Sequence, residues 1–230
     1  AEGLALGDVD GDGDIDLVVA NSSYAVSGTA GGMVFFNDGA GGFGTSTHYA
    51  ATVFAKGVSL NDVEGDGDLD IVVVDRNGDP DWDSHPNGDE IEVLLNNGSG
   101  VFGSPTEYFI DGNQPEVITA GDFNLDGAID FAVSSQNGDG PSATVSILLN
   151  NGSGTFVLDD SYSLGSNYTN RLTSGDVDGD GDTDLLVANA TSDDLVVFFN
   201  DGAAQFDSTT RYAGARDRVS LVDLDRDNDL

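Results

Sequence analysis

Cysteine is absent from the 230 residues of this chain. No disulfide can therefore stabilise the fold, and no thiolate can serve as a nucleophile or a zinc ligand. Basic side chains are scarce, because 7 Lys and Arg stand against 42 Asp and Glu, and the formal net charge is −35. Nucleic acids and anionic membranes attract Lys and Arg, so neither is expected as a partner. No apolar run approaches the ~20 residues of a spanning helix, so membrane insertion is not expected either.

Glutamate and proline are also rare, with 6 Glu beside 36 Asp and 5 Pro beside 32 Gly. Asp and Gly favour turns and loops, whereas Glu favours helices. No stretch repeats its apolar residues every 3.6 positions, so we expect almost no helix. The apolar fraction is 38% and reaches about half when glycine is added, which is ordinary for a folded domain and argues against disorder.

What the chain does contain is an internal repeat. An acidic segment of the type DVDGDGDID recurs five times, and a second signature of the type VFFNDGAGGF follows the first four copies. The acidic segments begin at residues 8, 62, 122, 176 and 223, and the second signatures span 34–43, 93–102, 147–156 and 197–206. The repeat covers the whole chain, which predicts a single domain over 1–230. Its repeats are approximately 1–55, 56–113, 114–167 and 168–215, with a partial fifth at 216–230.

Each repeat predicts four short strands. A brief apolar stretch precedes the acidic segment, a β-branched run such as DLVVAN follows it, and the second signature supplies a third strand. The Asn-Asp-Gly or Asn-Asn-Gly turn in that signature favours a hairpin into a fourth strand. Four antiparallel strands repeated about every 50 residues are typical of propeller blades. The predicted fold is therefore an all-β propeller with about four four-stranded blades. A four-bladed ring and part of a larger ring both remain open.

The acidic segments have the form Asp-x-Asp/Glu/Asn-x-Asp-Gly-x-x-Asp. Side-chain oxygens at positions 1, 3, 5 and 9 can converge on one cation, and position 7 can offer its carbonyl. Hard oxygen ligands in this number suit Ca²⁺ better than Mg²⁺ or a transition metal. An EF-hand would need Glu at position 12, where these segments have Val.

The expected ligands follow from these positions in each segment. Site 1 comprises Asp8, Asp10, Asp12, Asp16 and the carbonyl of Asp14; site 2 comprises Asp62, Glu64, Asp66, Asp70 and the carbonyl of Asp68. Site 3 comprises Asp122, Asn124, Asp126, Asp130 and the carbonyl of Ala128; site 4 comprises Asp176, Asp178, Asp180, Asp184 and the carbonyl of Asp182. An incomplete fifth site comprises Asp223, Asp225 and Asp227.

The two ordered signatures, GDVDGDGDIDLVVAN at 7–21 and FFNDGAGGF after it, resemble the FG-GAP family, also called integrin-alpha-type or VCBS-type repeats. The resemblance implies a β-propeller, commonly of seven blades, with Ca²⁺ in the loop between the first two strands of a blade. It places the metal at the positions named above. Asn124 and Ala128 depart from the pattern and lower the charge of site 3.

The alternative is that these acids only form turns on an acidic surface. However, 22 of the 42 acids lie in the five loops. Four or five carboxylates in nine residues repel one another, and a cation offsets that repulsion. The cofactor prediction is therefore about four Ca²⁺ ions that act as structural crosslinks, with a regulatory role as the other reading.

Three further features lie outside the acidic segments: the segment 75–90, His48 and the glycosylation sequons. The segment 75–90 contains Trp82 and His85 and is interpreted as a solvated insertion, a ligand site, or an extra metal site at Asp79, Asp81 and Asp83. His48 is predicted to be a half-exposed strand residue. Glycosylation sequons begin at Asn21, Asn97, Asn151, Asn167 and Asn189.

We expect a secreted or cell-surface calcium-binding propeller that mediates adhesion or recognition and has no catalytic residues. Its partner is expected to be a protein or glycan bound by variable loops on the face opposite the calcium loops. Two alternatives are a structural protein that self-assembles into a fibre, and an accessory or catalytic propeller of a polysaccharide-degrading enzyme. The chain is also expected to be part of a longer protein.

Overall fold

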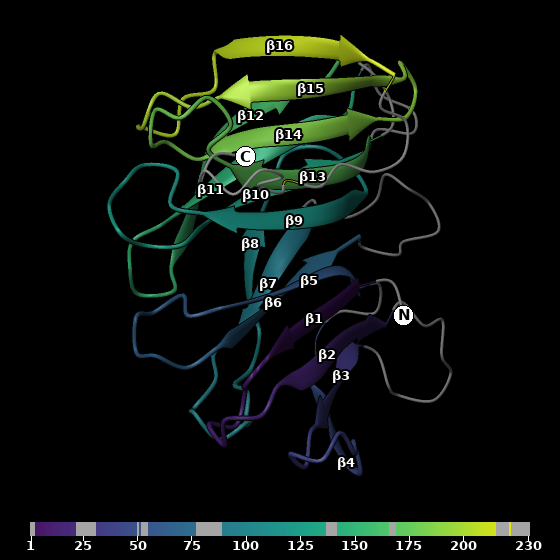
Figure 1. Ribbon diagram of the computed structural model, residues 1–230, viewed down its shortest axis with the longest axis vertical. Coiled ribbons are helices and arrows are strands. Elements are labelled where there is room, and N and C mark those ends of the chain that lie inside the picture. Colours follow the sequence, from purple (N-terminus) through teal and green to yellow (C-terminus); the bar gives the residue numbers. More distant parts are fainter. Residues whose placement is uncertain are drawn as a thin grey trace. The chain divides into compact units, whose positions relative to one another are not determined.

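A computed structural model describes residues 3–21, 31–49, 51, 55–76, 89–136, 142–165, 169–214 and 221. Within these ranges sixteen strands form four four-stranded sheets, which we call blades 1 to 4 (Figure 1). Blade 1 contains β1 (Gly3–Gly7), β2 (Asp16–Asn21), β3 (Gly31–Phe36) and β4 (Thr45–Tyr49). Blade 2 contains β5 (Ala55–Asn61), β6 (Asp70–Asp75), β7 (Glu90–Leu94) and β8 (Thr106–Phe109). Blade 3 contains β9 (Pro115–Gly121), β10 (Asp130–Ser135), β11 (Thr144–Asn150) and β12 (Phe156–Ser163). Blade 4 contains β13 (Thr169–Gly175), β14 (Asp184–Asn189), β15 (Asp194–Phe199) and β16 (Ser208–Ala213).

Every blade pairs its strands in chain order and antiparallel. The second strand of each blade begins at the ninth residue of the acidic segment, as the β-branched runs predict. The turn after the third strand is tight, and Gly39 of Asn-Asp-Gly has a φ of 71°, which favours glycine. No helix occurs among the described residues. The all-β prediction with propeller-type blades is therefore confirmed.

The acidic loop joins the first and second strands of each blade, so it lies at one end of the sheet. The connection between the second and third strands lies at the other end. In blade 4, where residues 190–193 are described, Figure 1 shows the acidic loop and this connection at opposite ends of the strands. This arrangement separates the predicted metal loops from the variable loops.

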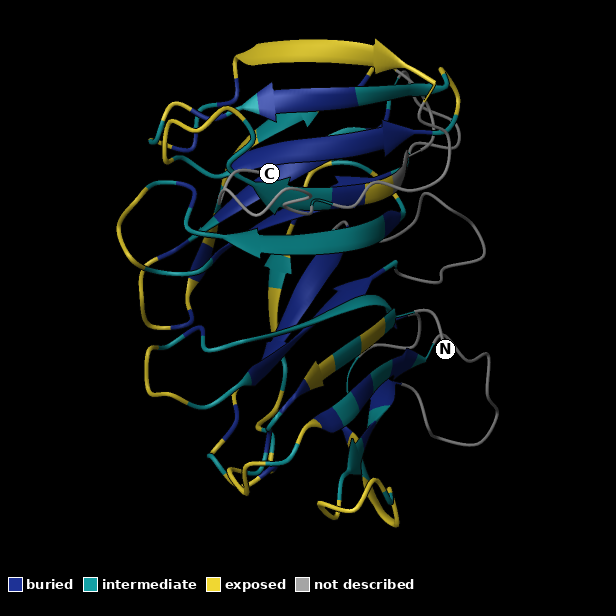
Figure 2. Ribbon diagram, in the orientation of Figure 1, coloured by how far each residue is buried: buried dark blue, intermediate teal, exposed yellow. Residues whose placement is uncertain are grey.

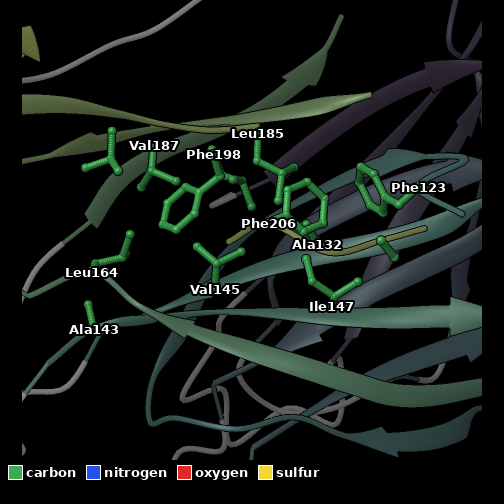
Figure 3. Packing of buried hydrophobic residues seen from close by; sticks show 13 residues of the cluster. Phe123, Ala132, Ala143, Val145, Ile147, Leu164, Leu185, Val187, Phe198 and Phe206 are labelled. Carbon is green, nitrogen blue, oxygen red and sulfur yellow. The ribbon is translucent and has the colours of Figure 1, made fainter. Parts of the chain in front are cut away.

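The chain divides into two compact units. Unit 1 comprises residues 1–110 and 152–155 and holds blades 1 and 2; unit 2 comprises residues 111–151 and 156–230 and holds blades 3 and 4. In unit 1 the core between the two blades includes Val18, Ile71 and Leu94. In unit 2, Figure 3 shows Phe123, Phe206 and neighbouring side chains packed together. The Phe123 and Phe206 rings meet edge to face at 5.7 Å.

Burial differs between strands of a blade. The second strand β14 is buried along its whole length, whereas the outer strand β16 is exposed (Figure 2). Two faces of β14 are thus covered, which explains its continuous apolar run. On β1, by contrast, Leu4 and Leu6 are 60% and 62% exposed.

Several predicted features lie outside the described residues, namely Asp223, Asp225, Asp227, Asn167, Trp82, His85, Asp79, Asp81 and Asp83. In the part of the chain that is described, no helix is long and apolar enough to cross a membrane.

Candidate metal centres

The first aspartate of each acidic loop shapes the loop. In blade 1, Asp8 Oδ1 accepts a hydrogen bond from the amide of Gly11 at 2.8 Å, and Asp8 Oδ2 accepts one from Gly13 at 2.9 Å. Both glycines have positive φ, 76° and 93°. The loops around Asp62 and Asp176 repeat this pattern. Around Asp122 the amides of Asp126 and Gly127 donate instead. The chain therefore curls around one carboxylate and brings the following side chains back toward it.

The ninth aspartate closes the loop from the other side. Asp16 is fully buried; its Oδ2 accepts the amide of Val9 at 3.0 Å and its Oδ1 accepts the amide of Asn37 at 2.9 Å. One carboxylate thus connects the acidic loop to the hairpin after the third strand. The same two bonds occur at Asp70, Asp130 and Asp184, which are also fully buried.

The structure brings the predicted ligands together. Carboxylate oxygens of Asp8, Asp10 and Asp12 lie within 4.8 Å of one another. The same holds for Asp176, Asp178 and Asp184 in blade 4. Asp180 also belongs to that loop, where its Oδ1 accepts the amide of Asp182.

The two remaining loops show the same proximity through other interactions. In site 2, burial raises the pKa of Glu64, and the nearby carboxylates of Asp66 and Asp70 raise it further. In site 3, the Asn124 amide donates to Asp126 Oδ2 at 3.0 Å, so Asn124 replaces one repulsive contact by a hydrogen bond.

Electrostatic repulsion remains in the loops. Burial raises the pKa of Asp10, and Asp12 and Asp16 raise it further. Burial raises the pKa of Asp130 to about 6, although two backbone amides oppose this rise. A cation among these carboxylates would stabilise their ionised forms.

In three of the loops the side chain of the seventh residue lies against the hairpin of the second signature. A Cβ on Gly39 would lie 2.6 Å from Asp14 Oδ2, so this carboxylate rests against the hairpin of the second signature. Asp68 and Asp182 lie in the same way against Gly98 and Gly202. These contacts are compatible with the prediction that Asp14, Asp68 and Asp182 offer only their carbonyls, as Ala128 must.

The residues present fit a hard divalent cation. Every predicted metal ligand in these loops is an oxygen of a carboxylate, an amide or a carbonyl, and a carboxylate oxygen that accepts one amide keeps further acceptor capacity. Five or more such oxygens in an irregular loop suit Ca²⁺, which takes 6–8 oxygens, better than octahedral Mg²⁺.

Sequence reasoning missed a second role of the hairpin turn. The first Asn of each turn binds the acidic loops: Asn96 Nδ2 donates to the carbonyl of Leu69 at 3.0 Å and to that of Val9, in blade 1, at 2.8 Å. In unit 2, Asn200 Nδ2 donates in the same way to Thr183 and to Phe123. The sequence contained a signal for this second role, because this Asn recurs at the same position in all four second signatures. The turn therefore joins neighbouring blades as well as reversing the chain.

Three remaining predictions concern single positions. His48 lies on β4 and is exposed rather than half-exposed, because β4 is the outer strand of its blade. Asn21 and Asn189 end second strands, and Asn189 is fully buried. Asn97 and Asn151 lie in the hairpin turns, and Asn97 is exposed there.

Four-stranded blades with an acidic loop between their first two strands define a repeat protein of the propeller type. A family model described as FG-GAP-like repeat matches residues 8–73 and 122–187, more than half of the chain. The chain belongs to this family. No curated protein matches it.

Proposed function

We propose that the four complete acidic loops bind Ca²⁺ and that the ions stabilise an extracellular module for adhesion or recognition. The convergence of the loop carboxylates carries this proposal. Oxygens of three acids lie within 4.8 Å in sites 1 and 4, and the loop residues 8–16 and 176–184 contain no Lys or Arg. Such a group is stable at neutral pH when a cation balances its charge.

The recognition role rests on the arrangement of the loops. The acidic loops lie where the first strands end and the second strands begin, whereas the variable segments leave from the opposite ends of the second strands, so a partner there would not compete with the ions. A protein or a glycan at that end is the proposed partner, and the extracellular location follows from the abundance of Ca²⁺ there, where modules bind it with Kd values of ~10⁻⁴–10⁻³ M. The module is proposed to have no chemistry of its own.

Calcium removal tests the metal part of the proposal. Thermal unfolding is measured in Ca²⁺ and in EGTA, and we expect a higher midpoint in Ca²⁺. At ten times Kd, each site adds about 1.4 kcal/mol to the free energy of unfolding. Asp12→Asn should reduce the calcium-dependent part, because it removes one charged ligand of site 1.

The matched control is Asp159→Asn, which removes the same charge from an exposed position on β12 outside the loops. It should leave the calcium-dependent shift unchanged. An equal midpoint in Ca²⁺ and EGTA would contradict the proposal, and a glycan array probed in Ca²⁺ then tests the recognition role separately.

A further inference from the structure

Blade 1 leaves large apolar side chains uncovered on one face of its sheet. Along β1, exposed residues alternate with less exposed ones, and the exposed side chains are Leu4 and Leu6 (Figure 2). The positions that alternate with them face blade 2, since a Cβ on Gly7 would lie 3.2 Å from Leu60 Cδ1. Successive residues of a strand point to opposite sides of the sheet. Leu4 and Leu6 therefore project away from blade 2.

The strand register extends this apolar face over three strands. Directly paired residues of antiparallel strands project from the same side of the sheet. Two rows of such residues cross β1, β2 and β3, and together we call them the leading face of blade 1: Leu4, Val19 and Met33 in one row, Leu6, Leu17 and Phe35 in the other. All of these residues are half-buried or exposed. On the opposite face, by contrast, Val18, Ala20 and Val34 are buried in the core shared with blade 2.

The same positions of the repeat are covered in blade 2. Its leading face has the rows Val58, Val73, Glu92 and Leu60, Ile71, Leu94. Ile71, Val73 and Leu94 are buried in one core with Val18 and Val34 of blade 1, and Val58 and Leu60 pack against that core. In unit 1 a leading face is thus an interface that packs on the sheet of another blade.

Blade 4 shows the same arrangement in unit 2. Its leading-face positions are apolar apart from Ser174 and include Leu172, Leu185, Val187, Val196 and Phe198. These five side chains are buried in one core with Ala132, Val145 and Ile147 of blade 3. The leading face of blade 1 therefore has the composition and register of a surface that packs on a sheet in both units.

This face is also free of negative charge. Its rows contain no Asp or Glu, and they continue onto β4 with His48 and Ser46. The chain carries a formal net charge of −35, which keeps copies apart elsewhere on the surface. A basic partner would gain nothing from a neutral apolar face. Two copies of this chain, in contrast, can meet here without bringing carboxylates together.

The second copy is expected to present the same face. Stacking blade 4 of one copy on blade 1 of another would need an open apolar face on blade 4. Its side chains on the face away from blade 3, Leu186, Ala188 and Val197, are already buried. Two like faces, on the other hand, can pack as two aligned sheets about 10 Å apart.

We propose that two copies of this chain associate through the leading face of blade 1, about a two-fold axis. The contact buries Leu4 and Leu6, as Val58 and Leu60 are packed in blade 2. It uses the face of the sheet, so the acidic loops at the strand ends stay free to bind ions. An isologous contact of this kind closes on itself, so the product is a dimer and not a fibre.

Sedimentation velocity of the full chain in Ca²⁺, from micromolar to near-millimolar concentrations, tests the proposal. We expect a monomer–dimer equilibrium. Leu6→Asp should raise the dimer Kd at least about tenfold, because each substitution removes two leucines from an isologous contact. Val157→Asp is the matched control, since Val157 is 65% exposed on β12 of blade 3, and it should dimerise like the unsubstituted chain. Equal thermal midpoints of the two variants at low concentration would show that both fold.

Three results of this measurement would overturn the proposal. The first is a monomer at every concentration. The second is a dimer that Leu6→Asp leaves as tight as before, because the contact then lies elsewhere. The third is a series of larger oligomers or filaments, because an isologous contact stops at two copies.

Cross-linking locates the contact without a charged substitution. The chain contains no cysteine, so a single introduced thiol reacts at one known place. Leu6→Cys treated with a short bis-maleimide should give a covalent dimer, and Val157→Cys should not under the same conditions. Equal cross-linking of the two variants, or none for Leu6→Cys, would overturn the proposal whether or not the acidic loops bind Ca²⁺.

Discussion

At the scale of single residues, the ninth aspartate of each loop has a structural task in addition to its predicted role as a ligand. Asp130 is fully buried, and its two oxygens accept the amides of Phe123 and Asn150 at 3.0 and 2.8 Å. These bonds connect the start of the acidic loop to the hairpin after β11. The carboxylate is therefore needed whether or not an ion is present.

Asp130→Ala should reduce the free energy of unfolding by about 2 kcal/mol or more, in EGTA as well as in Ca²⁺. The substitution leaves two buried amides without acceptors, and each unsatisfied group costs about 1–3 kcal/mol. Urea unfolding measures this change. Asp126→Ala in the same loop is the control, because Asp126 is exposed; in EGTA it should change stability much less. Equal effects of the two variants in EGTA would contradict the structural role.

Leu125 is strained in a way that the other loops avoid. Its φ is 57°, where Gly11, Gly65 and Gly179 hold the corresponding position. A left-handed backbone costs a residue with a side chain about 1–2 kcal/mol. Leu125 is also 56% exposed, so its side chain contributes little burial.

Leu125→Gly should therefore raise the free energy of unfolding, by up to about 1 kcal/mol after the greater chain entropy of glycine is subtracted. Urea unfolding in Ca²⁺ measures the change. The reverse substitution, Gly65→Leu, should lower the stability by a similar amount. A stabilised Gly65→Leu variant would show that the backbone at this position is not constrained.

At the scale of strands, the pair β15 and β16 is joined by an ion pair. Burial alone would raise the pKa of Asp194, but hydrogen bonds from Ser192 and Arg211 outweigh it and hold the pKa below its usual value. Arg211 also donates to the carbonyl of Leu164 at 2.9 Å, which connects β16 to the end of blade 3.

The ion pair predicts a pH dependence of stability. Because the folded pKa of Asp194 is lowered, its contribution is present above the unfolded pKa of about 3.9 and is lost as the pH falls through the folded value. Arg211→Ala should destabilise the protein by no more than about 1 kcal/mol at pH 7, since the pair is partly exposed. The difference from the unsubstituted chain should shrink at about pH 3. Urea unfolding at both pH values, with Asp194→Asn in a double-mutant cycle, measures the coupling.

Strands and acidic loops could be predicted from the sequence because their signals are local and repeated. The β-branched run DLVVAN became β2 with the expected bounds, Asp16–Asn21. The proximity of Asp75, Glu90 and Glu92 could not be predicted, because Glu90 and Glu92 follow Asp75 by 15 and 17 positions and meet it only through the register of β6 and β7. The dual role of Asp16 was equally hidden, since its partner Asn37 lies 21 residues away.

At the scale of the whole molecule, the formal net charge of −35 affects the stability of the fold. Like charges at this density destabilise the compact state through repulsion. Salt shortens the range of that repulsion, from ~10 Å at 0.1 M to ~3 Å at 1 M. Bound divalent cations would reduce the same repulsion in the acidic loops, where the carboxylates are most crowded.

We therefore expect NaCl to raise the unfolding midpoint more in EGTA than in Ca²⁺. Thermal scans at low salt and at about 1 M NaCl, in both conditions, provide the measurement. KCl serves as the control for a specific effect of Na⁺ and should give the same shifts. Equal salt effects with and without Ca²⁺ would indicate that the loops do not dominate the repulsion.

The amide cage around Asp8 and Asp16 also has a kinetic consequence. Backbone amides that donate to these two carboxylates hold the loop in its curled form. The ligand oxygens are therefore already positioned before a cation binds. Binding then costs little conformational entropy of the chain, and this preorganisation raises the affinity. Uptake should therefore proceed at a rate limited by the encounter and by the departure of water from the ion.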